Sequence, residues 1–117
     1  FTIGIANSIT VNVTNTSGAP AYLSAWIDFN HNNTLEVGEQ VISNVSISNG
    51  TNALDETYVF NVPGTAASLA DVGVRVRISS VSGTGPTGAG GAGEVEDYRV
   101  RLCPPKPCGV TTLIANP

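Results

Sequence analysis

Residues 22–29 read YLSAWIDF, a stretch in which the apolar residues fall on alternate positions: Leu23, Ala25, Ile27 and Phe29. Successive side chains of a β-strand point to opposite faces, so this pattern predicts a half-buried strand. The same period of two recurs in segments that turn residues separate, at 9–13, 41–47, 58–62, 74–78 and 96–102. This spacing predicts an all-β chain: an antiparallel β-sandwich of roughly seven strands, immunoglobulin-like or jelly-roll-like.

Length and composition narrow the class of protein. The chain has 117 residues, the size of one domain, and 41% are hydrophobic, enough for one core. Charged residues make up only 12% and the net charge is −4, which argues against a nucleic-acid-binding surface of clustered bases. No apolar run approaches the roughly 20 residues of a membrane helix, so we expect no membrane insertion. We predict a β-sandwich domain over residues 1–102, followed by a connector rich in Pro and Cys over 103–117.

The segment 28–39 fits the spacing of a twelve-residue calcium loop. Calcium binds about six to eight oxygens, and alternate residues of a curling loop turn inward to supply them. The expected ligands are Asp28, Asn30, Asn32, Thr34 (through its carbonyl), Glu36 and Glu39. Asn33 occupies the position that usually holds glycine, and Asn tolerates the left-handed conformation well. The flanks are strands, so this is an EF-hand-like loop without flanking helices. The alternative is a polar loop whose Asn side chains bond its own backbone.

A second acidic segment opens the last predicted strand and reads GEVEDY, from Gly93 to Tyr98. Together with 26–30 and 37–40, this hexad strongly resembles the GEVED domain of bacterial secreted and surface proteins. The resemblance continues through 61–63, 74–78 and the Gly-rich loop at 86–88, and so covers roughly residues 9–102. It implies an extracellular β-sandwich module within adhesins, cell-surface proteins or secreted hydrolases.

Two acids of the hexad, Glu96 and Asp97, point to opposite faces of their strand. We expect one of them to complete the calcium shell and the other to pair with Arg75 or Arg77 on a neighbouring strand. The alternative is that the acids of the hexad only form ion pairs with those arginines, which contribute little when exposed.

Two further sets of residues carry expectations. Cys103 and Cys108 lie in a Pro-stiffened segment and are expected to form a disulfide in an oxidising compartment. The side chains that can stack on a sugar are Trp26, Tyr22 and Tyr58, with Trp26 either outward or in a second core. No catalytic constellation is recognisable, so we expect no enzymatic activity.

The sequence therefore predicts a non-catalytic, calcium-stabilised structural or adhesion module of a bacterial surface protein or filament, located outside the cell. Its expected partners are neighbouring domains or identical subunits that meet through edge strands. Residues 1–5 and 110–114 both read as strands, and either can add to the sheet of a neighbour. The alternative is a carbohydrate-binding module attached to a secreted enzyme.

Overall fold

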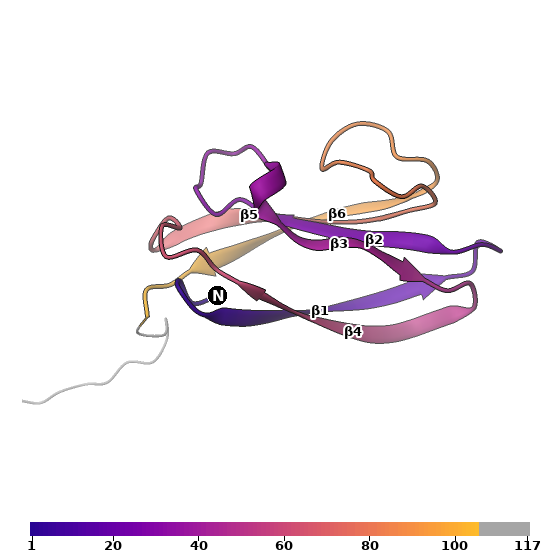
Figure 1. Cartoon of the computed structure of the whole chain (residues 1–117), viewed down its shortest axis with the longest axis horizontal. Helices are drawn as coiled ribbons and strands as arrows, with labels where there is room; N and C mark the ends of the chain where they lie inside the picture. The colour runs from indigo at the N-terminus through magenta and orange to yellow at the C-terminus, as the bar shows by residue number, and fades with distance from the viewer. Residues whose placement is uncertain (106–117) are drawn as a thin grey trace, which may run out of the picture.

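The computed structural model describes residues 1–105. It contains strands that form two antiparallel sheets (Figure 1), namely β1 (Ala6–Asn15), β2 (Ala21–Ile27), β3 (Gln40–Ile47), β4 (Thr51–Asn61), β5 (Ala70–Ser79) and β6 (Gly93–Leu102). The only helical element of the described part is the short 3-10 helix η1 (Val37–Glu39), and no helix there is long and apolar enough to cross a membrane. The predicted all-β, sandwich-like class is confirmed. The described residues form six strands where roughly seven were expected.

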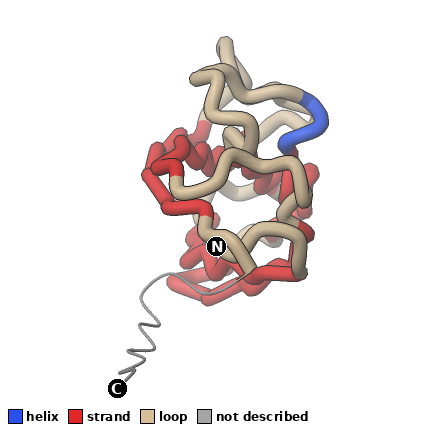
Figure 2. The backbone as a smooth tube through the Cα atoms, turned by 90° about the vertical axis from the view of Figure 1, so that its left-hand side faces the viewer, coloured by secondary structure: helices blue, strands red, loops and turns tan. Residues whose placement is uncertain are grey.

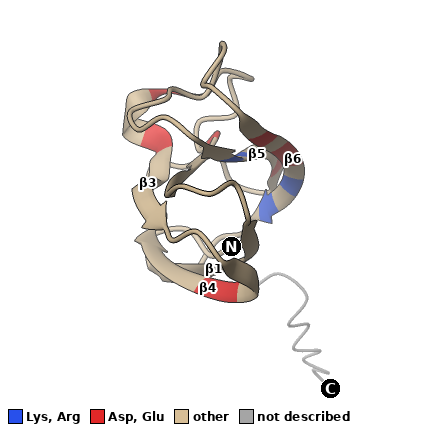
Figure 3. Cartoon of the chain, turned by 90° about the vertical axis from the view of Figure 1, so that its right-hand side faces the viewer, with Lys and Arg blue, Asp and Glu red and all other residues tan. Residues whose placement is uncertain are grey.

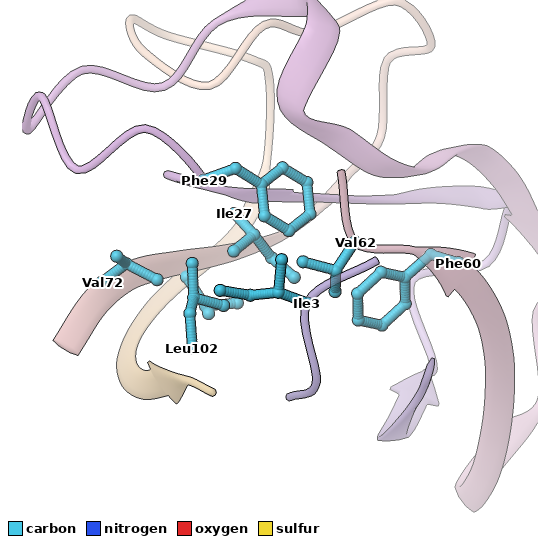
Figure 4. Packing of buried hydrophobic residues seen from close by; sticks show 8 residues of the cluster. Ile3, Ile27, Phe29, Phe60, Val62, Val72 and Leu102 are labelled. Carbon is cyan, nitrogen blue, oxygen red and sulfur yellow. The ribbon is translucent and has the colours of Figure 1, made fainter. Parts of the chain in front are cut away.

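The two sheets have unequal widths. The wider sheet has the strand order β3-β2-β5-β6, and β1 pairs with β4 in the narrower one. In Figure 1 the narrower sheet lies below the wider one. Buried apolar side chains from both sheets pack together between them. One cluster of buried residues fills the end of the sandwich shown in Figure 4, and includes Ile27, Phe60, Val72 and Leu102. A second cluster fills the other half and includes Val13, Leu23 and Ile42.

The N-terminal segment closes one end of the sandwich. The Ile3 amide donates to the carbonyl oxygen of Cys103 at 2.7 Å, and the Gly4 amide donates to that of Val62 at 2.9 Å. The Ile3 side chain is buried in the cluster of Figure 4, and the Phe1 ring packs edge-on against Phe60, with ring centroids 5.0 Å apart. Residues 1–5, which the sequence offered for exchange with a neighbour, are thus bound within their own domain.

Two loops cover the outer face of the wider sheet (Figures 1 and 2). They are residues 28–39, between β2 and β3, and residues 80–92, between β5 and β6. Arg77 holds the second loop, because its guanidinium donates to the carbonyl oxygens of Gly85 at 2.9 Å and Gly88 at 2.6 Å. Trp26 lies on this outer face and is only 2% exposed. The loops therefore form a third layer, on the face of the sheet where Trp26 is buried.

The Asn-Gly turn at residues 49–50 joins strands of different sheets. The sequence favours a tight hairpin here, and Gly50 does adopt a positive φ of 92°. The Thr51 amide donates to the Ser48 carbonyl oxygen at 3.2 Å and closes the turn. However, β3 belongs to the wider sheet and β4 to the narrower one. The turn thus carries the chain from one layer to the other.

Candidate functional site

The ends of the 28–39 loop lie side by side because β2 and β3 are paired. Trp26 is the register partner of Gln40, which places Asp28 beside Glu39. Both carboxylates are buried, at 2% and 6% exposure respectively. The Asn30 amide also donates to Glu39 Oε2 at 3.3 Å. The first and last residues of the predicted calcium loop are therefore brought together at its base.

The loop curls around the carboxylate of Asp28. Asp28 Oδ1 accepts the backbone N–H of Asn32 at 3.1 Å, and Oδ2 accepts that of Asn33 at 2.8 Å. Asn33 has a φ of 62°, the left-handed conformation expected at this position. The Thr34 amide donates to Asn32 Oδ1 at 2.9 Å, an Asx-type turn that adds to the curl.

Glu36 and Glu39 face the same loop from its C-terminal half. Glu39 Oε1 accepts the backbone N–H of Glu36 at 3.0 Å. Glu36 Oε1 accepts the side-chain amides of Asn30, at 3.4 Å, and of Asn32. Of the six predicted ligand residues, all but Thr34 are thus linked through side-chain hydrogen bonds within the loop. Thr34 is linked to the loop by its backbone amide, which donates to Asn32 Oδ1.

The loop concentrates negative charge, and Arg75 and Arg99 line the same hollow as its Asp28. Burial raises the pKa of Glu39, and the charges of Asp28 and Glu36 raise it further, against the lowering effect of hydrogen bonds from two backbone amides. Within residues 1–105, the salt bridges join Arg75 to Asp97 and Arg101 to Asp71, and neither involves the loop. Over the same residues, no group of three or more His, Cys, Asp or Glu side chains is arranged to hold a metal ion. A calcium shell here would need amide and carbonyl oxygens as well.

Glu96 and Asp97 of the hexad both have partners outside the loop, and the prediction that one of them completes the calcium shell stays a prediction. Both oxygens of Asp97 accept from Arg75, with Nε–Oδ1 at 2.7 Å and Nη2–Oδ2 at 2.8 Å. These bonds lower the pKa of Asp97. Glu96 lies on the opposite face of β6, where it accepts the Tyr98 hydroxyl at 2.6 Å. Asp97 and the loop residues Asp28 and Asn33 line one hollow of about 370 Å³ between the loop and β6.

The three residues expected to stack on a sugar differ in their exposure to solvent. Trp26 is excluded from this role because the loop layer buries its indole. Tyr22 is half-buried on the outer face. Tyr58 packs on the inner face, and its hydroxyl is buried without a hydrogen-bond partner among residues 1–105.

The predicted disulfide concerns the end of the described chain. Cys103 is buried and lies beside Thr2 in a short parallel bridge. Cys108 lies outside the described residues, so the pairing stays a prediction.

Two residues, Gly93 and Arg77, have structural roles in this region that the sequence did not predict. Gly93 opens the hexad with a φ of 155°, and a Cβ there would overlap the carbonyl oxygen of Ile78 on β5. Only glycine permits this close approach of the two backbones. The buried Arg77 organises the 80–92 loop through three carbonyl oxygens, those of Gly85, Thr87 and Gly88. The clue in the sequence was an arginine next to a long loop of uncharged residues.

Together these features define a class: an antiparallel β-sandwich whose β2–β3 loop gathers buried acids and whose last strand begins with a Gly-led acidic hexad. A family model, that of the GEVED domain, matches residues 22–101. This is most of the chain, and the chain belongs to the GEVED domain family. The match begins at β2, so β1 lies outside it. Searches of curated proteins and of solved structures returned no match.

Proposed function

We propose that this domain is a non-catalytic, calcium-stabilised structural module of an extracellular bacterial surface protein or filament. Membership of the GEVED family supports a small structural β-domain. The extracellular location and the adhesive or filamentous role follow from what the resemblance implies and from the low charge of the chain. In this proposal calcium is a ligand of the folded state and takes no part in a reaction.

The observation that carries the proposal is the pair of buried carboxylates at the base of the 28–39 loop. Asp28 and Glu39 are almost inaccessible, and their hydrogen-bond donors in the described structure are backbone amides. Buried carboxylates with no positive partner are costly. A divalent cation coordinated by the loop oxygens would offset that cost and lock β2 to β3.

Two alternatives predict different behaviour. A polar loop that only satisfies its own backbone would show the same Asx-type hydrogen bonds, but its stability would not depend on calcium. A sugar-binding module would need exposed aromatic rings, and the burial of Trp26 removes the largest of them. The structural module is the function that the geometry supports best.

Thermal unfolding of the full chain, in chelator and in excess calcium, tests the proposal. Calcium at about 100 times its dissociation constant should add roughly 2.7 kcal/mol to the free energy of unfolding. For a domain of this size, that shift raises the Tm by on the order of ten degrees or more.

The variant Glu39→Gln should lose most of this rise in Tm, because the amide supplies one oxygen and no charge. Asp55→Asn removes an equal charge from the exposed face of β4 and should keep the rise. Titration calorimetry with calcium then checks that Glu39→Gln also weakens calcium binding and that Asp55→Asn does not. Identical unfolding curves with and without calcium would refute the calcium part of the proposal.

A further inference from the structure

One side of the sandwich is uncovered because four strands face two in the described part of the chain. The short turn between β3 and β4 keeps β4 on the β3 side of the molecule. On the other side, a groove of about 650 Å³ runs between β1 and the inner faces of β5 and β6. The groove extends to the end of the molecule where β1 ends and β6 begins, since Asn15 and Gly93 both line it.

The floor of this groove is apolar core surface. Ile9 and Val11 of β1 and Val76 and Ile78 of β5 face the interior, yet they are only half-buried. Tyr98 of β6 also lines the groove and is 52% exposed. An exposed apolar strip of this kind, rimmed by polar residues, is typical of an interaction site.

The rim of the groove on the β1 side is an unprotected strand edge. Within residues 1–105, β1 pairs only with β4, so its other edge leaves backbone N–H and C=O groups unpaired. In natural proteins, charged residues or proline on an edge strand usually prevent it from pairing with another strand. β1 has neither over residues 6–15, whereas β6, at one edge of the wider sheet, carries acids in its first half and arginines in its second (Figure 3). β3, the other edge of the wider sheet, also lacks charges and proline, but it does not line the groove. β1 is therefore the unprotected edge that opens onto the groove.

We propose that this groove binds residues 110–114 of a second copy of the chain as an added strand along β1. The segment is Val110-Thr111-Thr112-Leu113-Ile114, which is uncharged and rich in the β-branched residues that favour strands. Five residues of an antiparallel strand span about 17 Å, the length of about five residues of β1. The apolar side chains of the segment would cover the half-buried residues of the groove.

The direction of the strands favours a second copy over the chain's own segment. Cys103 lies beside Thr2, so the chain leaves β6 at the end of the sandwich where β1 begins (Figure 1). A segment that folded back into its own groove would run parallel to β1. The same segment from a copy stacked head to tail, at the far end of the groove, would run antiparallel to β1. Antiparallel pairing matches both existing sheets and is the more common arrangement.

This inference extends the proposed structural role but does not use the calcium loop. A head-to-tail contact of this kind joins two different surfaces of identical copies, so it propagates into an open chain. Each copy would complete the sandwich of its neighbour. Assembly and calcium-dependent melting are therefore separate measurements, and either can fail without the other.

Sedimentation velocity of the full chain over a range of concentrations is the first test. We expect oligomers that grow with concentration. Leu113→Asp and Ile114→Asp place a charge in the segment and change no residue of the described domain, and should raise the concentration for half-maximal assembly about tenfold or more. Asn116→Asp adds the same charge outside the segment and should assemble like the parent chain.

Amide hydrogen exchange identifies the acceptor. Addition of a peptide of residues 106–117 to the full-length Leu113→Asp variant should slow the exchange of β1 amides that otherwise exchange freely. The same peptide with Ile114→Asp should not. A parent chain that stays monomeric at every concentration would overturn the proposal. This holds even if residues 110–114 of the same chain protect the β1 amides from exchange. So would assembly that survives a Leu113→Asp/Ile114→Asp double substitution.

Discussion

Single residues of the outer sheet face are committed to specific partners. Arg75 binds both oxygens of Asp97 and also donates to the Pro86 carbonyl oxygen at 2.9 Å. Arg77, two residues along the same strand face, is buried and binds the 80–92 loop instead. The sequence left open which arginine pairs with the hexad, and only the register of β5 and β6 decides it, because that register sets Arg75 opposite Asp97.

The Arg75–Asp97 pair predicts a specific pH dependence. The hydrogen bond from Arg75 lowers the pKa of Asp97 in the folded state, so the pair stabilises the fold above the unfolded pKa of about 3.9. That contribution is lost as the pH falls through the folded pKa. Because the Asp97 side chain is 60% exposed, Asp97→Asn should cost at most about 1 kcal/mol at neutral pH.

The measurement is urea unfolding of the parent chain and of Asp97→Asn from neutral pH to below about pH 4. The difference in unfolding free energy between the two proteins should shrink as the pH falls. A difference that stays constant down to the lowest pH would contradict this assignment.

The Tyr58 hydroxyl gives a second prediction at the residue scale. It is buried without a partner among residues 1–105, and burial raises its pKa, as does the nearby charge of Glu56. Tyr58→Phe removes an unsatisfied polar group while keeping the ring, so the free energy of unfolding should stay the same or rise by up to about 1 kcal/mol. A matched change, Tyr98→Phe, removes a hydroxyl that donates to Glu96 and should not stabilise. Urea midpoints measure both, and a clear loss in Tyr58→Phe would show that the hydroxyl is bonded.

At the scale of the elements, residue alternation predicted the strands well, because a period of two is a local property. Each of the six strands predicted between residues 9 and 102 overlaps an observed one, although β1, β4, β5 and β6 begin before the predicted segments. Residues 1–5, which also read as a strand, form only an isolated bridge at Thr2, and residues 110–114 lie outside the described part of the chain. The left-handed Asn33 was also predictable, since the spacing of the loop alone demands it. The layer of loops over Trp26 was not predictable, because it depends on contacts between segments far apart in the chain.

Gly93 tests how the hexad strand is joined to its neighbour. Gly93→Ala would force a side chain against the Ile78 carbonyl oxygen at a positive φ, so we expect a loss of roughly 1–3 kcal/mol and faster amide exchange at the start of β6. Gly64→Ala serves as the control, because a Cβ there meets nothing within 4 Å. Its unfolding free energy should change by less than about 0.5 kcal/mol. Equal behaviour of the two variants would show that β6 can shift to accept the methyl group.

At the scale of the whole molecule, the sandwich is closed at one end and open at the other. The N-terminal segment and the cluster around Ile27 and Leu102 seal the closed end. The groove beside β1 leaves the open end and one flank accessible. The sequence predicted a two-layer fold but not this asymmetry, because strand order and the unequal widths of the sheets cannot be read from local alternation.

The closed end predicts a large effect for a residue close to the N-terminus. Ile3→Ala should reduce the free energy of unfolding by about 2–5 kcal/mol, since Ile3 is buried in the core. Ile5→Ala removes the same atoms from a side chain that is 52% exposed and should cost much less. The two denaturation midpoints in urea give the comparison. Similar losses would mean that the segment does not seal the core in solution.

The burial of Trp26 has a practical consequence. It is the only tryptophan of the chain, and it lies two residues before Asp28. Its fluorescence spectrum is therefore an intrinsic reporter of the ordering of the loop layer, with no attached dye. A red shift of the emission maximum that precedes the loss of the far-ultraviolet β signal would reveal that the loops detach before the two sheets come apart.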